Sequence, residues 1–175
     1  MKFLDKLKGF SLGRKKGGDD DDELHGDAGP DILDGGTGND VLNGGGDADT
    51  LLGGSGDDEL HGGTGPDILD GGTGNDTLTG GQGDDTLQGG DNDDQYLFDT
   101  GFGTDQFDDT AGLDTLNFSS IPDVIYGQIT SGSLAFTMGS DSASGTASMD
   151  YIILGPADDE INVVSYPNYR VQITD

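Results

Sequence analysis

The sequence predicts an all-β protein, a right-handed parallel β-roll (β-helix) of nine nonapeptide repeats with a C-terminal β-rich cap. Three observations favour this fold class. The chain repeats every nine residues between positions 17 and 97, it carries far more acidic than basic side chains, and β-prone segments follow the repeats. Only 30% of the 175 residues are hydrophobic, which is too little for a large apolar core of the usual kind.

The repeat keeps a strict phase. Gly opens all nine units between Gly17 and Leu97, and position eight is Leu in eight units and Tyr96 in the last. A flexible acidic linker would need this composition but no fixed phase, so the phase indicates a repeating structure. Position six is Asp in every unit: Asp22, Asp31, Asp40, Asp49, Asp58, Asp67, Asp76, Asp85 and Asp94.

Each unit divides into a turn and a short strand. Positions one to six read GGxGxD, and Gly and Asp are the residues that tight turns favour. Positions seven to nine are expected to be extended, with Leu facing inward and its neighbours facing out. Two units then make one coil of 18 residues, and stacked coils pair in parallel about 4.8 Å apart. The Asp of one unit therefore lies above the Asp two units away.

The charge predicts a bound cation. The chain has 35 acidic and 7 basic residues, and beyond residue 16 the single basic residue is Arg170. Stacked carboxylates repel one another, so the body is either disordered or recruits cations. Ca²⁺ accepts six to eight oxygens at about 2.3–2.6 Å, whereas Mg²⁺ demands a tighter octahedron. Gly-rich turns leave their carbonyls accessible, so we expect Ca²⁺ between stacked turns.

Residues 17–97 resemble the repeats-in-toxin (RTX) family of haemolysin-type calcium-binding proteins, whose repeat is this nonapeptide. The resemblance implies that each ion lies between the turns of units i and i+2, bound by position-six carboxylates and turn carbonyls. Nine units form such pairs from Asp22/Asp40 to Asp76/Asp94, which implies roughly seven Ca²⁺ ions. The turn glycines assigned to these sites are Gly17, Gly35, Gly44, Gly53, Gly62, Gly71, Gly80 and Gly89.

Some units depart from the pattern. Asp27 replaces the second Gly of its unit, and Asp20, Asp47 and Asn92 replace the Gly at position four. Asp and Asn tolerate left-handed backbone conformations, so these turns are expected to survive. The first unit is the most acidic, and we expect it to be frayed.

The N-terminal segment, residues 1–16, places Phe3, Leu4, Leu7 and Phe10 at helical spacing among basic residues. This pattern predicts a short basic amphipathic helix that caps the first coil. Two alternatives stay open, an expression leader and a contact with an anionic membrane.

The C-terminal region, residues 98–175, is expected to be a β-rich capping and secretion region, because solenoids need capped ends. A degenerate repeat is predicted at residues 154–162, where Asp159 would be a further metal ligand. Four further aspartates could form a calcium site at the cap or belong to a solvated loop, and we favour the solvated loop: Asp105, Asp108, Asp109 and Asp114.

Other chemistries find little support. Nucleic acid would be repelled, no run of 18 apolar residues exists, and there is no cysteine. We see no catalytic motif and expect no enzyme activity. His25 and His61 could form a zinc pair, but duplication of the ELHG sequence explains them as well. Thr37/Asn39 and Thr73/Asn75 suggest an ice-binding row, which Ser55 and Asp57 interrupt.

The first functional hypothesis is a secreted, monomeric calcium-binding module that folds cooperatively on binding Ca²⁺ outside the cell. The resemblance implies type I export, and residues 1–16 lack the pattern of a secretory signal peptide. The second hypothesis is a calcium-stiffened adhesin or matrix protein that binds a glycan or another cell-surface ligand. The third is the non-catalytic C-terminal part of an exoenzyme or toxin.

Overall fold

A computed structural model describes residues 13–118, 126–130, 133–138, 141–154, 160–163 and 170–173. Every regular element in these residues is a β-strand, and no helix among them is long and apolar enough to cross a membrane. The repeat region contains β1 (Arg14–Gly18), β2 (Glu23–Ala28), β3 (Ile32–Thr37), β4 (Val41–Gly46), β5 (Thr50–Ser55), β6 (Glu59–Thr64), β7 (Ile68–Thr73), β8 (Thr77–Gln82), β9 (Thr86–Asp91) and β10 (Gln95–Leu97). The remaining strands are β11 (Thr104–Asn117), β12 (Tyr126–Thr130), β13 (Ser133–Met138), β14 (Asp141–Leu154), β15 (Glu160–Val163) and β16 (Arg170–Ile173).

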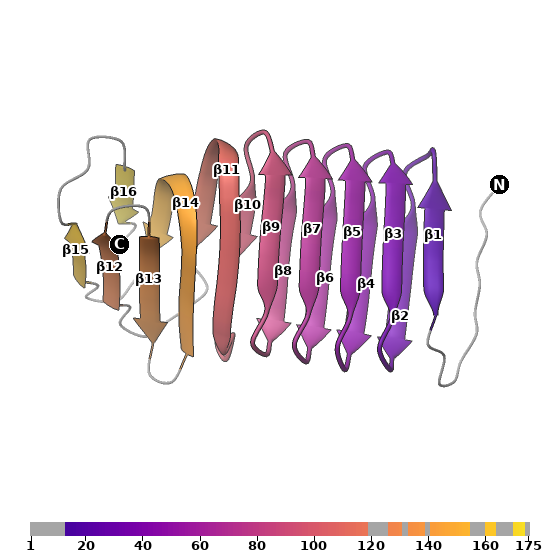
Figure 1. The fold of residues 1–175 in the computed structure, drawn as a ribbon, viewed down its shortest axis with the longest axis horizontal. Coiled ribbons are helices and arrows are strands. Elements are labelled where there is room, and N and C mark those ends of the chain that lie inside the picture. Colours follow the sequence, from indigo (N-terminus) through magenta and orange to yellow (C-terminus); the bar gives the residue numbers. More distant parts are fainter. Residues whose placement is uncertain are drawn as a thin grey trace.

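The strands of the repeat region form two parallel layers (Figure 1). Odd-numbered strands β1 to β9 pair along one face, and even-numbered strands β2 to β10 pair along the other. The register is 18 residues, as in the pairing of Leu33 with Leu51 and of Leu42 with Leu60. The parallel β-roll predicted from the sequence, with two units in each coil, is therefore confirmed.

The core is a double column of leucines between the two layers. Position eight points inward, and each leucine from Leu33 to Leu87 at this position is 0% exposed. Leu24, in the first coil, is packed against the column but only half-buried. One leucine from each unit forms a core that is continuous along the roll but only one side chain thick on each face, so burial supplies limited stabilisation per coil.

The strands are longer than the sequence predicted. Strands β2 to β9 run from position seven through position three of the next unit, so only positions four to six form the turns between them. The second glycine, expected in the turn, instead pairs in parallel with its equivalent in the next coil, as Gly36 does with Gly54, and the first glycine lies beside it within the strand. Position two keeps a positive φ within the strand, for example 112° at Gly36, which only a residue such as Gly adopts at little cost.

The roll continues beyond Leu97, where the sequence suggested that the period ended. β11 pairs with β9 through Phe107 and Leu87, and with β10 through Leu116 and Tyr96. These pairs are 20 residues apart, so this coil contains two residues more than the others. Phe107 and Leu116 take the inward positions and are 2% and 0% exposed.

Aromatic side chains close the described core at this end. Phe98, which lies in the inserted segment, stacks on Phe118 with ring centroids 4.5 Å apart and meets Phe102 edge-on at 5.3 Å. Tyr96 packs against Phe107, and its hydroxyl accepts a hydrogen bond from the Gly89 N–H. The core therefore widens from single leucines to an aromatic cluster, whose rings bury much more surface for each residue.

Beyond this coil the backbone mixes parallel and antiparallel pairs. β14 pairs in parallel with β11 and with β16, and β12 pairs in parallel with β15. β13 pairs antiparallel with both β12 and β14. The predicted ligand Asp159 lies outside the described residues.

The N-terminal end differs from the expected helix. Residues 1–12 lie outside the described part, but Arg14, Lys15 and Lys16 belong to β1, so the helix prediction is wrong for these three. Lys15 pairs with Leu33 and takes the place of an inward leucine, while its ammonium donates a hydrogen bond to the His25 carbonyl. An alkyl stem with a charged tip suits the end of an apolar column, because the tip reaches a polar partner.

Candidate metal centre

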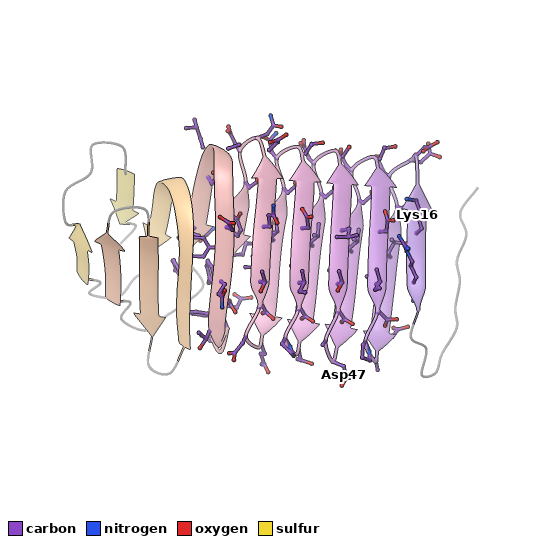
Figure 2. The ribbon with its side chains drawn as sticks, viewed as in Figure 1. Lys16 and Asp47 are labelled. Carbon is purple, nitrogen blue, oxygen red and sulfur yellow. The ribbon has the colours of Figure 1, made fainter. Side chains whose placement is uncertain are left out.

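The position-six aspartates form two columns, one along each edge of the roll. In the orientation of Figure 1, turns that follow odd-numbered strands lie at the upper edge, and turns that follow even-numbered strands lie at the lower edge. Figure 2 labels Asp47 in one of the lower turns. The upper column contains Asp22, Asp40, Asp58, Asp76 and Asp94, and the lower column contains Asp31, Asp49, Asp67 and Asp85.

Hydrogen bonds connect the members of each column. The backbone N–H of Asp40 donates to Oδ1 of Asp58 at 2.7 Å, and the same contact recurs from coil to coil along both columns at 2.7–3.0 Å. Side chains in these columns are buried, with 1–3% exposure from Asp31 to Asp94. Asp22 is only half-buried, but the first unit, which we expected to be frayed, contributes to β1 and β2 and donates the Asp22 N–H to Asp40 at 2.8 Å.

The second carboxylate oxygen has no such partner. Oδ2 is buried and makes no hydrogen bond in seven of these residues: Asp31, Asp40, Asp49, Asp58, Asp67, Asp76 and Asp85. A buried polar atom without a partner costs roughly 1–3 kcal/mol, and more if it is charged. A regular row of such atoms indicates that a proton or a cation normally occupies their surroundings.

The first glycine of each unit makes room for this oxygen. A Cβ on Gly53 would lie 2.5 Å from Oδ2 of Asp58 and 2.6 Å from the carbonyl oxygen of Gly71, in the next coil. Position one has no positive φ here, so it requires Gly for space rather than for backbone conformation. A carboxylate oxygen and a carbonyl oxygen lie within 3 Å of the same point at Gly17, Gly26, Gly35, Gly44, Gly53, Gly62 and Gly71.

These oxygens fit the coordination chemistry of Ca²⁺. Carboxylate and carbonyl oxygens are the ligands that this ion prefers, and its flexible coordination suits a site assembled from two neighbouring coils. Within the part of the chain that the structure describes, no three Asp, Glu or His side chains converge on one point. Any cation in the columns would therefore depend on carbonyls as well as on two carboxylates.

Burial also changes the acidity of the columns. Desolvation is the largest cause of the shifts: it raises the pKa of Asp58, Asp76 and Asp85 from 3.8 to about 6 and that of Asp67 to about 7. Neighbouring aspartates add to the increase, and the backbone hydrogen bond reduces it in part. The same causes raise the pKa of Asp49. These four carboxyls therefore bind protons closer to neutral pH than an ordinary aspartate does.

Sequence reasoning missed two members of the columns. Asp105 and Asp114, which we favoured as part of a solvated loop, are 1% and 0% exposed, and they accept hydrogen bonds from the N–H groups of Asp85 and Asp94. The two-residue insertion shifts them out of phase with the repeats. The local pattern G-x-D-x-Φ, where Φ is Phe107 or Leu116, was the signal that could have revealed them.

Three of the four substituted positions keep the positive φ of the repeat, and Asp20 does not. Asp27, Asp47 and Asn92 have φ of 78°, 73° and 84°, so side chains that tolerate this region replace Gly where the turn requires it. At position five of the upper edge, Asp and Asn alternate, and each side-chain oxygen accepts the N–H of the next coil, as Asp57 Oδ1 does from Asn75. The suggested ice-binding row therefore includes side chains that already bond within the turns.

The two histidines do not meet. The register places Asn43 between His25 and His61, and each imidazole contacts the Glu two residues before it, His25 with Glu23 at 3.0 Å and His61 with Glu59 at 2.8 Å. A shared zinc ion would require the two rings in adjacent coils, which the register contradicts.

Comparison with protein families identifies the repeat. The family described as RTX calcium-binding nonapeptide repeat matches four overlapping segments, at residues 16–51, 52–87, 61–96 and 70–104, which together span just over half of the chain. The chain therefore belongs to the RTX family, and its described repeats form a calcium-binding β-roll of that family.

Among solved structures, the extracellular lipase LipA from Serratia marcescens is similar to this chain, with a TM-score of 0.29 and 18% sequence identity. The similarity covers 81% of this chain and 39% of the lipase chain, so the chain spans less than half the length of that lipase. Among curated proteins, no sequence matches significantly.

Adding one methyl group should show that position one has less free space than position three of the repeat. We expect Gly53→Ala to destabilise the calcium-loaded protein by roughly 1–3 kcal/mol, because its Cβ would crowd Asp58 and the Gly71 carbonyl. Gly46→Ala is the matched control, since its Cβ would meet only the Thr64 hydroxyl at 3.3 Å; its effect should stay within about 0.5 kcal/mol. Urea unfolding measures both, and equal effects would contradict the space requirement at position one.

Acidification should favour the metal-free roll. The pKa values of Asp58, Asp67, Asp76 and Asp85 are raised on folding, so the folded state binds protons more strongly than the unfolded chain. This contribution is complete below about pH 4 and is lost as the pH rises through 6 to 7. Far-UV circular dichroism in chelator should therefore show more β-structure at about pH 4.5 than at about pH 7.5, and less of this gain in Asp67→Asn. A β signal independent of pH would contradict the buried carboxyl columns.

Proposed function

We propose that Ca²⁺ ions bind between the stacked turns of this protein and that their binding drives its folding. The observation that carries the proposal is the row of buried Oδ2 atoms without hydrogen-bond partners along both edges. Each is accompanied by a glycine without a side chain and, from Asp31 to Asp76, by a carbonyl oxygen of the next coil. An ion that supplies positive charge there removes the cost of the buried carboxylates.

The proposed ligands are the position-six aspartates of adjacent coils together with the first glycines of the turns. Between the coils of Asp40 and Asp58, for example, the donors would be both carboxylates and the carbonyl of Gly53. The same pairing over nine units gives roughly seven ions. Asp159 remains a proposed ligand of a degenerate repeat.

Metal binding and folding are coupled in this scheme. A net charge of −28 opposes compaction, and the leucine column is too thin to overcome that repulsion by itself. An ion that binds only the folded state stabilises it by mass action, and contacts between neighbouring coils make the transition cooperative. Calcium therefore acts as a structural element that is added after synthesis.

We further infer that the protein works outside the cell. Proteins with RTX repeats are typically secreted, and millimolar extracellular calcium would fill sites that stay empty in a cytosol poor in calcium. The proposed route is type I export of the unfolded chain, followed by folding where calcium is abundant. The protein then acts as a monomeric binding and folding module, with no catalytic role assigned to the roll.

A calcium titration of matched variants tests the proposal. Circular dichroism should show a cooperative gain of β-structure with Ca²⁺ and little gain with Mg²⁺. Asp58→Asn removes charge from two proposed sites and should raise the calcium midpoint roughly three- to tenfold. Asp57→Asn is the control, because it removes the same charge from an exposed residue next to Asp58. Asn is compatible with this position, since Asn39 and Asn75 occupy the equivalent position in the two adjacent coils.

Two results would contradict the proposal. An equal response to Mg²⁺ would remove the selectivity for calcium. Equal midpoints for Asp58→Asn and Asp57→Asn would show that charge in general, and not the position-six carboxylate, controls folding.

A further inference from the structure

The coil formed by residues 98–117 continues both edges of the roll beyond the nonapeptides. Its register against the preceding coil is 20 residues, because two residues are inserted after Leu97. Despite this insertion, Asp105 takes the place of a position-six Asp on the lower edge, and Asp114 does so on the upper edge. The family match ends at residue 104, before either aspartate.

Asp105 makes the contacts of an inner column member. Asp85 donates its N–H to Oδ1 of Asp105 at 3.0 Å, and Gln106 donates its N–H to the Asp85 carbonyl at 2.8 Å. One coil earlier, the equivalent contacts between Asp67, Asp85 and Thr86 are 2.8 and 2.9 Å. The lower column therefore extends into this coil with its geometry preserved.

The turn itself is also built like the inner turns. Gly103 has a φ of 81°, and a Cβ on it would collide with the Gly83 carbonyl, just as a Cβ on Gly83 would collide with the Gly65 carbonyl. Gly103 therefore stacks on Gly83 as the position-four residues of the inner coils stack on one another. The backbone leading to Asp105 follows the same course as in those coils, despite the insertion.

Asp85 supplies a carboxylate oxygen for this gap. Its Oδ2 is buried and makes no hydrogen bond, and the residue is 1% exposed. In the inner coils, the equivalent oxygen and a carbonyl oxygen of the next coil both lie close to the place where a Cβ on the first glycine would be. At Gly80 the three nearest atoms all belong to Asp85, so the next coil brings no carbonyl as close as at the other glycines.

We propose that Asp85 and Asp105 bind a further Ca²⁺ ion between the last nonapeptide coil and the coil of residues 98–117. The inference rests on the proposed function, since it assigns an additional site of the same chemistry. Because fewer protein oxygens lie close to this site, water completes the coordination and its affinity is the lowest on the lower edge. The site joins the aromatic end of the core to the calcium-dependent repeats.

Counting bound ions in matched variants tests the site. Native mass spectrometry in excess calcium should find one ion fewer in Asp105→Asn than in the unchanged protein. Asn keeps an oxygen that accepts the Asp85 N–H, so the variant removes charge while preserving that hydrogen bond. Asp108→Asn, which changes an exposed residue of the same strand, should leave the count unchanged. An unchanged count in Asp105→Asn would overturn the proposal.

A second measurement needs no variant. In crystals of the unchanged protein soaked with Tb³⁺, the anomalous map should show a peak between Asp85 and Asp105. Peaks between Asp40 and Asp58 without one between Asp85 and Asp105 would overturn this site and leave the proposed function intact. The absence of peaks from every turn would overturn the proposed function as well.

Discussion

The structure depends on how two columns of buried carboxylates are neutralised. Each column places an aspartate every coil, holds one oxygen by a backbone N–H and leaves the other in a dry position beside a glycine. Such an arrangement is unfavourable for unpaired charges in a chain with only seven basic residues. Protons or calcium ions can remove this cost, and the proposed function assigns that role to millimolar calcium outside the cell.

The remaining features of the roll serve these columns. The glycine at position one keeps space open next to the carboxylate, and the leucine column holds successive coils at a spacing that aligns the turns. The two ends of the described core use different chemistry, since Lys15 takes the first described inward position and the rings of Phe98, Phe102 and Phe118 cluster at the other end. Under the proposed function the repeats depend on bound calcium, whereas an apolar aromatic cluster stabilises the coil of residues 98–117.

The strict phase of Leu and Asp made the coil, its register and both columns predictable. The length of the strands was not predictable, because Gly-Gly in isolation indicates a turn, and only pairing with the next coil, as between Gly36 and Gly54, makes it extended. The place of Asp105 in the lower column was not predicted, because an insertion breaks the nine-residue phase and Phe107 takes the position of the leucine. The inward position of Lys15 was not predicted, because only the pairing of its strand shows that this charged residue occupies a leucine position.

Small-angle X-ray scattering with and without calcium tests the central claim most directly. In excess chelator at neutral pH, we expect the radius of gyration to approach the roughly 40 Å of an unfolded chain of this length. Millimolar calcium should reduce it to the value of a folded, elongated roll. A chain that stays equally compact in chelator and in calcium would show that the carboxylate columns need no metal, and the account would be wrong.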